Sequence, residues 1–571
     1  MTTTDTTSTA TTTTTSTVSA LTSSGSNTSS TSSSIDWDAL IEATVAAEQV
    51  SADSLDLKIA ENELEIAAYT DMQSLLQDLE TAAEAIRGTG SLTSNDDIFS
   101  YREAYLTANG DVSASSALVV TVDEGTTTGT YDLEIDQLAT AHKIAGDSQT
   151  DAYTDLGLSG VVSIGLENMT AVEFTITGTM SLAEIAEEIN GSSSVTGVSA
   201  SVIQVDDGDF RLVLSGTETG QAIQISDVSG THDIGEALGL IADSSGTIKN
   251  ELQAAQDAVI TLDGITITRD SNTIDDVLDG VTLNLYQETG TDNSISVEIA
   301  SDLTSIKSAI TNFVDAYNAY REFALTQQEV TTGGGASSES TLFGDSTLRS
   351  ANRDISGALG TVIDGNTMAF LGLSYDSSNY LVYDEDTLND ALLNNLDEVE
   401  KMLTFQMDSS SNDVALLSRS TNMPDSLQLD ITVDGDGNMT GVSVGGDDSL
   451  FEVSGTRIKG VAGTDYEGIT FVFTGDSSQT VDLTFSSGLV EELYNAVNSY
   501  SDASDGLLSE MITDLTETTA DYQEESDEIR DWAEGDFRDY ITTLYAGYQA
   551  AIEEAESMLD YLTALLEYGN D

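Results

Sequence analysis

Apolar residues recur at three- and four-residue steps near both ends of this 571-residue chain, and that spacing limits the possible folds more than any other feature. One stripe lies between residues 35 and 87 and the other between 508 and 565, and each is typical of a long amphipathic helix. Asn62 and Gln73 interrupt the first stripe with polar groups, which weaken a coiled coil but can fix its register. Gly506 and Gly535 are the expected interruptions of the second. We therefore expect two long helices from opposite chain ends to pair.

The middle of the chain has an alternating pattern that predicts short β-strands bounded by Gly, Asp and Asn turns. The clearest segments are ALVVTV (117–122), TYDLEI (130–135), AVITLDGITITR (258–269) and GVTLNLY (280–286). A helix is predicted from Asp302 to Thr326, and residues 331–340 are expected to be a flexible loop. A second β-rich stretch, 424–486, contains a predicted hairpin with the turn DGDGN (434–438).

This order predicts an α+β multidomain protein in which the long terminal α-helices form a coiled-coil-like leg, with a mainly antiparallel β head and an additional β insertion. Residues 1–34 are rich in Thr and Ser and are expected to be a disordered tail. The other predicted parts are the terminal helices (35–50 and 545–571), the helical leg domain (51–98, 301–405 and 487–544), the β head domain (99–145 and 251–300), an inner head domain (146–250) and the β insertion (406–486).

The chain carries 100 Asp and Glu residues against 17 Lys and Arg residues, a formal net charge of -83. Such a surface repels phosphate backbones and anionic lipid headgroups, so we expect no nucleic acid partner and no membrane insertion. The self-repulsion fades in concentrated salt, and we interpret the acidity as a solvated surface, with a high-salt habitat as a hypothesis. The absence of cysteine excludes disulfides and zinc-thiolate sites.

The N-terminus lacks the basic and apolar regions of a secretory signal peptide, and no run of about 18 apolar residues predicts a spanning helix. We expect a cytoplasmic protein or one exported without a cleaved signal.

Residues with catalytic potential do not form a recognisable constellation. His142 and His232 lack the spacing of a metal or nucleophile motif, and a structural role is expected for each. The segment from Asp430 to Gly441 approaches calcium-loop spacing but ends in glycine where a bidentate acid is needed, so a β-hairpin turn is the better interpretation. Weak calcium binding by scattered acids stays open. We predict no catalytic residues, no cofactor and no metal site, hence no enzyme.

Large apolar residues gather near both chain ends, where helices usually fray. Between Gly488 and Asp571 there are 22 acidic and 2 basic residues, so the outer face of these helices must stay wet. An amphipathic stripe often packs only against its own chain. This many apolar residues nevertheless favours contact with a partner or with further copies. The predicted contact residues are Ile35, Trp37, Leu40, Ile41, Val45, Tyr545, Tyr548, Met558, Leu562, Leu565 and Leu566.

Several segments, taken in order, resemble the bacterial flagellar filament capping protein family, also called flagellar hook-associated protein 2. The N-terminal part resembles it over residues 35–69 and 129–145. Residues 181–191 (SLAEIAEEING), 198–203 and 210–225 resemble the hook IN motif of flagellar axial proteins, with Ile189 and Asn190 at its naming positions. The C-terminal family region is similar over 263–285, 310–320, 342–350 and 371–403.

The resemblance implies a secreted protein at the distal tip of the bacterial flagellum that promotes flagellin polymerisation and prevents leakage of unpolymerised flagellin. It also implies a pentamer-like ring homo-oligomer, type III export and a cytoplasmic export chaperone that grips the C-terminal helix. The alternatives are another axial flagellar protein, either a hook-filament junction protein or a flagellin, or an acidic surface adhesin. Four features depart from the family pattern: the tail 1–34, acids in place of most lysines of the leg helices, Ala52 where a proline is common, and the insertion 406–486.

Overall fold

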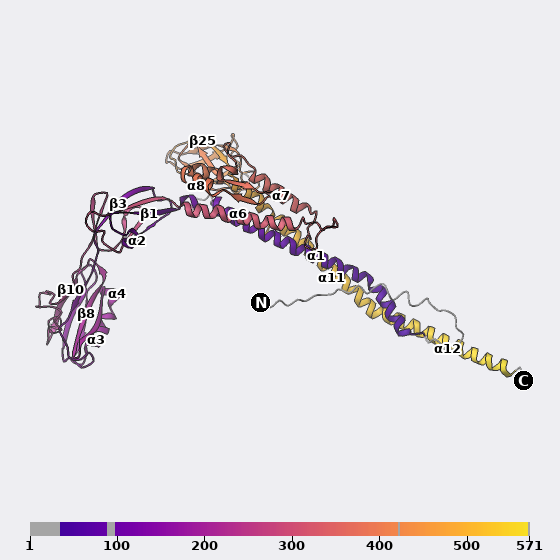
Figure 1. The fold of residues 1–571 in the computed structure, drawn as a ribbon, viewed down its shortest axis with the longest axis horizontal. Coiled ribbons are helices and arrows are strands. Elements are labelled where there is room, and N and C mark those ends of the chain that lie inside the picture. The colour runs from indigo at the N-terminus through magenta and orange to yellow at the C-terminus, as the bar shows by residue number, and fades with distance from the viewer. Residues whose placement is uncertain (1–34, 88–96, 421–422, 569–571) are drawn as a thin grey trace. The chain divides into compact units, whose positions relative to one another are not determined.

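The computed structural model describes residues 35–87, 97–420 and 423–568, so the predicted tail lies outside the described residues. The chain divides into two compact units. The terminal unit comprises residues 1–67 and 512–571, and the central unit comprises 68–511. The finer division into six parts stays a prediction. Figure 1 shows helices near both ends of the chain and the strands between them, as the sequence predicts.

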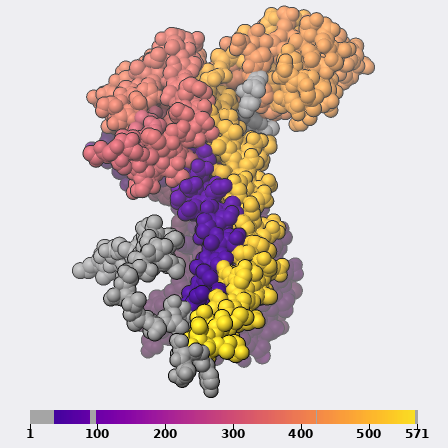
Figure 2. All heavy atoms as spheres, turned by 90° about the vertical axis from the view of Figure 1, so that its right-hand side faces the viewer, coloured from indigo at the N-terminus to yellow at the C-terminus, as the bar shows by residue number. Residues whose placement is uncertain are grey.

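The terminal unit is built from helices of both chain ends. Helix α1 (Trp37–Arg87) enters it with its residues up to 67. Its partners are α11 (Leu507–Trp532), a π-helical turn η4 (Ala533–Phe537) and α12 (Arg538–Tyr568). Figure 2 shows α1 in indigo and the C-terminal helices in yellow running side by side. The predicted pairing of the two chain ends is confirmed.

Both predicted glycine interruptions are present, but they differ in kind. Helix α10 (Leu489–Ser501) ends before Gly506, and α11 begins after it. Asp502 accepts hydrogen bonds from the backbone N–H groups of Ser504 and Asp505, which makes this interruption a turn. At Gly535 the helix does not end, because it widens into η4 and continues as α12.

The strand patterns near 117–135 and 258–286 form two antiparallel sheets in the central unit. The five-stranded sheet has the order β1-β15-β3-β11-β12 and the three-stranded sheet has the order β13-β14-β2. Leu133, Ile135, Ile260 and Ile295 are fully buried in the hydrophobic core of these sheets. The elements are β1 (Arg102–Asn109), α2 (Ala114–Ala117), β2 (Leu118–Val122), β3 (Gly129–Gln137), β11 (Ala258–Leu262), β12 (Ile265–Arg269), β13 (Thr273–Leu278), β14 (Val281–Leu285) and β15 (Ser294–Ser301).

The segment with the predicted hook IN motif folds around helix α3 (Leu182–Asn190). Ser181 and Glu184 form a capping box at its start, and Ile189 is buried in the core. The Asn190 side chain both donates to and accepts from the backbone of Ala200, each at 2.8 Å, so it ties the helix to strand β7 (Val198–Asp206).

Two antiparallel sheets, β10-β4-β8-β7 and β6-β5-β9, complete this segment. Its other elements are β4 (Ala141–Ala145), β5 (Gly160–Leu166), β6 (Val172–Ile176), α4 (Ser193–Thr196), β7 (Val198–Asp206), β8 (Asp209–Thr219), β9 (Ile223–Gly230), α5 (Ile234–Ala237) and β10 (Glu251–Gln253).

Helix α6 (Leu303–Thr326) confirms the helix predicted after the strands. Asp302 caps it by accepting hydrogen bonds from the backbone N–H groups of Thr304 and Ser305. Residues 331–340 contain no helix or strand, as expected of a loop. The neighbouring elements of the central unit are η2 (Ile98–Ser100), α7 (Ser346–Leu359), η3 (Met368–Leu371), β16 (Leu373–Tyr375), β17 (Leu381–Tyr383), α8 (Glu385–Asn394) and α9 (Leu396–Leu403).

The predicted β insertion contains two four-stranded antiparallel sheets, β18-β25-β20-β21 and β19-β24-β23-β22. Phe471 and Phe473 are buried in its core. The predicted hairpin is present, and Asp434 accepts hydrogen bonds from the backbone N–H groups of Asp436 and Asn438 within its turn. The strands are β18 (Gln406–Ser409), β19 (Val414–Ser418), β20 (Ser426–Val433), β21 (Met439–Ser443), β22 (Phe451–Ser454), β23 (Arg457–Gly460), β24 (Thr470–Phe473) and β25 (Gln479–Ser486).

A buried carboxylate joins the last turn of α1, the first turn of α10 and the segment that follows β19. Glu491 accepts hydrogen bonds from Arg87 at 2.9 and 3.0 Å and from Arg419 at 2.7 Å, and its side chain is 3% exposed. The Arg87 guanidinium also lies 3.4 Å from the centre of the Tyr494 ring. Burial lowers the pKa of Arg419. We call this cluster the Glu491 joint.

Candidate functional site: the terminal helices

Four-residue steps place the C-terminal helix against α1. Ala533 and Ile541 are buried, and Phe537 and Tyr545 are half-buried. In an uninterrupted α-helix, about 100° per residue would rotate position 545 about 120° away from position 533. The π-helical turn η4 takes up one extra residue and reduces that offset to about 20°. The turn therefore keeps these residues on the face towards α1.

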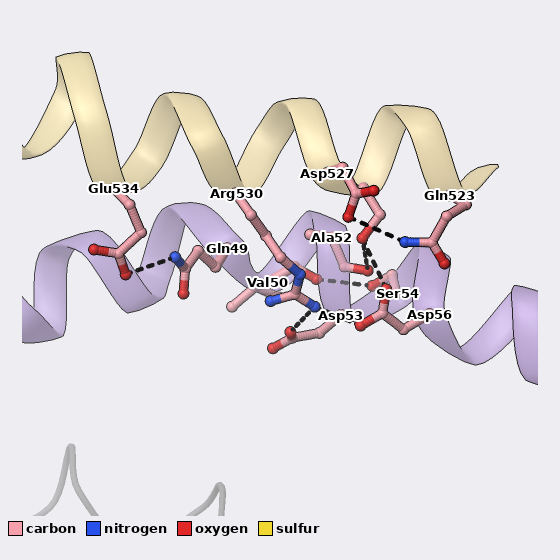
Figure 3. A network of polar contacts seen from close by, with 11 residues as sticks. Gln49, Val50, Ala52, Asp53, Ser54, Asp56, Gln523, Asp527, Arg530 and Glu534 are labelled. Carbon is pink, nitrogen blue, oxygen red and sulfur yellow. Dashed lines mark hydrogen bonds and ion pairs between the residues drawn. The ribbon is translucent and has the colours of Figure 1, made fainter. Parts of the chain in front are cut away.

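Ion pairs and hydrogen bonds fix the register of the pair (Figure 3). The Ser526 hydroxyl donates to Asp56 at 2.7 Å, and Arg530 donates to both Asp53 and Asp56. The hydrogen bond from Ser526, followed by that from Arg530, lowers the pKa of Asp56. Ser526 and Ala52 are both fully buried. Small side chains therefore allow the two helices to approach closely here.

A second set of polar contacts continues the same row towards the start of α1. Arg538 donates to both carboxylate oxygens of Glu42, at 2.7 and 2.8 Å, and this hydrogen bonding lowers the pKa of Glu42. Arg538 also donates to Glu534, which accepts a hydrogen bond from Gln49. Arg530 and Arg538 are the two basic residues between Gly488 and Asp571, and both reach carboxylates of α1.

Asn62, predicted to interrupt the apolar stripe, has a partner within the pair. Its side chain donates to the Thr519 hydroxyl at 3.1 Å. Lys58, one turn earlier, lies 5.0 Å from the centre of the Tyr522 ring. A polar layer of this kind specifies one register, because a shifted register would leave the amide without its partner.

Some of the predicted contact residues are used inside the pair itself. Ile41 and Val45 are buried in a cluster with Ala533 and Ile541. Trp37 and Tyr545 are half-buried, their ring centres are 5.8 Å apart, and the Tyr545 hydroxyl lies 3.2 Å from that of Thr44. Ile41 and Val45 therefore serve the intramolecular core, which removes both from the candidate surface.

The remaining predicted residues are exposed. All side chains from 546 to 566 are exposed, and Figure 1 shows α12 continuing past the start of α1. The sequence-based contact set omitted Ile552, Leu559 and Tyr561, although they continue the same three- and four-residue spacing. The α12 face is defined here by the exposed large apolar residues of α12 between positions 546 and 566, which are Tyr548, Ile552, Met558, Leu559, Tyr561, Leu562, Leu565 and Leu566. Ile35 and Leu40 are also exposed near the start of α1.

Most acidic residues of this part of α12 lie away from the α12 face, and Glu554, one turn before Met558, lies within it. Glu553, Glu556 and Asp560 are three or four positions apart and lie on the side of the helix away from Met558 and Leu562. The last part of α12 is thus an amphipathic helix whose apolar side has no cover among the described residues. Such a face can bind a complementary apolar groove or another helix.

The two histidines have structural partners. His142 is buried, its Nδ1 accepts from the backbone N–H of Ile223 at 2.8 Å, and its Nε2 lies 3.1 Å from Glu251. His232 accepts a hydrogen bond from the backbone N–H of Ser159. Across residues 35–87, 97–420 and 423–568, no three His, Asp or Glu side chains are grouped as metal ligands. In the same ranges no helix is long and apolar enough to cross a bilayer.

Three family descriptions match successive parts of the chain. The C-terminal domain of flagellar hook-associated protein 2 matches residues 255–544, and its N-terminal domain matches residues 33–142. The flagellin hook IN motif matches residues 155–218. The last match contains Ile189 and Asn190, the two residues whose packing fixes α3.

Individual relatives agree with the family match. The chain is 28% identical to the lateral flagellar hook-associated protein 2 of Vibrio parahaemolyticus, over 53% of this chain and 66% of that protein. It is 25% identical to the A-type flagellar hook-associated protein 2 of Pseudomonas aeruginosa, over 65% of this chain and 79% of the relative. The chain is also similar to a crystal structure of the flagellar cap protein FliD from Escherichia coli. The sequences are 26% identical, the match covers 59% of this chain and 90% of the FliD chain, and the TM-score is 0.45.

Proposed function

This chain belongs to the flagellar hook-associated protein 2 family, and from that premise we propose that it promotes flagellin polymerisation by contacting flagellin through the α12 face. It is a flagellar cap protein, an exported protein that works at the distal tip of the filament. In this proposal the protein acts by binding flagellin and promoting its assembly into the filament. The α12 face is the observation that supports this assignment of the contact.

The α12 face suits a partner that is bound and released repeatedly. Met558, Leu562 and Leu566 are each more than half exposed, so covering each one contributes about 1 kcal/mol, part of the roughly 1.5 to 3 kcal/mol for full burial. Several such side chains together support binding that is reversible. A cap that stays at a growing tip needs contacts of this limited strength, because each new subunit must displace it.

Copies of the chain assemble with one another in this proposal, as a ring that is pentamer-like. An export chaperone is proposed to cover the α12 face before the protein leaves the cell through the type III apparatus. One apolar face cannot hold flagellin and a chaperone at the same time. Release of the chaperone at export would therefore free the face for flagellin.

The test replaces apolar residues of the α12 face while keeping the helix. Met558→Gln, Leu562→Gln and Leu566→Gln are combined, since glutamine is a good helix former. The matched control carries Glu553→Gln and Glu556→Gln on the opposite side of the same helix. Binding of purified protein to flagellin is measured together with filament length and flagellin monomer in the medium of a complemented deletion strain.

We expect the apolar triple variant to bind flagellin at least tenfold more weakly, to leave short filaments and to release flagellin monomer. The control variant should behave as the natural protein. Binding with purified components separates this contact from any effect on export. Unchanged flagellin binding by the triple variant would refute the assignment of the α12 face.

A further inference from the structure

Basic side chains are scarce in this chain, and most of them are used within it. Of the 17 Lys and Arg residues, ten form ion pairs with carboxylates of the same chain. Arg102, Arg321 and Arg349 donate to backbone carbonyl oxygens, and Lys58 lies over the ring of Tyr522. All 17 lie in the described ranges, so three basic residues remain to be accounted for.

Two of the three remaining basic residues lie together. Arg457 and Lys459 are two positions apart on β23, so their side chains leave the same, exposed face of the sheet. Among the described residues, the side chain of neither one forms an ion pair or donates a hydrogen bond. Glu452 lies opposite Lys459 on the neighbouring strand β22, but the two side chains do not form an ion pair. The third residue, Lys143, lies apart on β4.

The two cations line a hollow of about 610 Å³ on this sheet face. Thr470 lies beside Lys459, and Ser454 lies beside Arg457, so hydroxyl groups adjoin both cations. Glu452 contributes one acceptor from the edge strand β22. This basic hollow therefore presents two positive charges, several hydroxyls and a single carboxylate.

We propose that the basic hollow binds an acidic surface segment of a neighbouring copy of this chain. This inference rests on the proposed self-assembly and adds the surface that it uses. A carboxylate of the neighbour would accept hydrogen bonds from Arg457 and Lys459, and such charge-assisted bonds are about twice as strong as neutral ones. Backbone N–H groups of the same segment would donate to Glu452.

The mixed chemistry of the hollow favours a polypeptide over a polyanion. A phosphate or sulfate polymer has few donors for Glu452, whereas a polypeptide offers carboxylates and N–H groups together. A second copy supplies 100 acidic residues. Distant charges of two copies are screened beyond about 8 Å at physiological ionic strength, while groups in direct contact still attract. The hollow thus lets copies that repel each other at long range associate at short range.

The test compares two double variants of the full-length protein that change the net charge equally. Arg457→Glu with Lys459→Glu reverses the hollow. Arg353→Glu with Lys401→Glu reverses two cations that already pair with acids of their own helices. Self-association is measured by sedimentation velocity across salt concentrations, and circular dichroism checks that each variant is folded. Flagellin binding is measured in parallel.

We expect the hollow variant to self-associate at least tenfold more weakly and the control less than twofold more weakly, with flagellin binding unchanged in both. Zero-length cross-linking of a mixture of isotope-labelled and unlabelled protein should join Lys459 to an acidic residue of the other copy. Equal self-association of both variants would overturn the proposal. So would a natural protein that stays monomeric at every salt concentration, or a folded hollow variant that loses only binding to flagellin or to an added sulfated polymer.

Discussion

The π-helical turn η4 predicts opposite outcomes for two single-residue changes at Gly535. Deleting Gly535 removes the extra residue, so 11 residues of plain α-helix would still bring position 545 to within about 20° of position 533. Inserting one alanine after Gly535 rotates everything downstream by about 100°. The deletion should preserve the face towards α1, and the insertion should turn it away.

The expected loss can be estimated from the contacts of two residues. The insertion exposes Ile541, whose burial is worth about 2 kcal/mol. It also separates Tyr545 from the Trp37 ring and from the Thr44 hydroxyl, at about 1 kcal/mol for each contact. The sum, about 4 kcal/mol, corresponds to a roughly thousandfold easier opening of this part of the pair.

The chain contains two tryptophans, and both report on the terminal unit. Trp37 contacts Tyr545, and Trp532 stacks on Phe537 with ring centres 4.9 Å apart. Tryptophan fluorescence during denaturation therefore follows these helices, and single replacements by phenylalanine assign the signal. Hydrogen exchange of the central unit provides the internal control, because its cores lie outside this pair.

We expect the insertion variant to lose the Trp37 signal at much lower denaturant concentration, with unchanged protection of the central unit. The deletion variant should stay within about 1 kcal/mol of the natural protein. Equal damage by the deletion and the insertion would refute the phase argument. An insertion without effect would do the same.

Three further predictions concern charge. Glu491→Gln should lower the free energy of unfolding of the central unit by about 3 to 5 kcal/mol, since it leaves two buried arginines without their carboxylate. The control Glu492→Gln on the same helix should change that free energy by less than about 0.5 kcal/mol. Denaturant titrations measure both. The lowered pKa of Glu42 means that its stabilising contribution is complete above the ordinary value of 4.5 and is lost as pH falls below it. Tryptophan emission of the terminal unit should therefore change on acidification, and Arg538→Gln should remove this change. Melting temperature should rise from low salt to about 1 M NaCl, and an unchanged value would contradict the high-salt interpretation.

The helices at both chain ends were predictable because their periodicity is local. Even the phase correction at η4 has a sequence signal, the successive four-residue steps from Ala533 to Tyr545. A glycine lowers the local stability of a helix, but it does not show whether the helix ends in a turn, as near Gly506, or continues through a π-helical turn, as at Gly535. Helix α1 contacts the chain near both glycines, through Gln73 to the Ser501 carbonyl and through Gln49 to Glu534, so the distinction is set by local packing that spacing does not report.

Contacts between distant segments were not predictable from spacing. Arg87 and Glu491 are 404 positions apart, and nothing in the sequence selects Glu491 from 100 acidic residues. Ile41 and Val45 show the related limit for the candidate site, because an apolar stripe looks the same whether its own chain or a partner covers it. The sequence indicates an apolar chain end beyond 546, and the structure adds that it is exposed.

The Glu491 joint has different consequences for deleting the β insertion and for replacing it with another module. A shortened chain without Arg419 would still pair Glu491 with Arg87, one cation for one carboxylate, so loss of the insertion leaves no orphaned charge. A foreign module grafted at the same place would bury that ion pair under new surface and, without its own arginine, would lack the contact that orients it. Removing the module should therefore cost less stability at this joint than replacing it with an unrelated one.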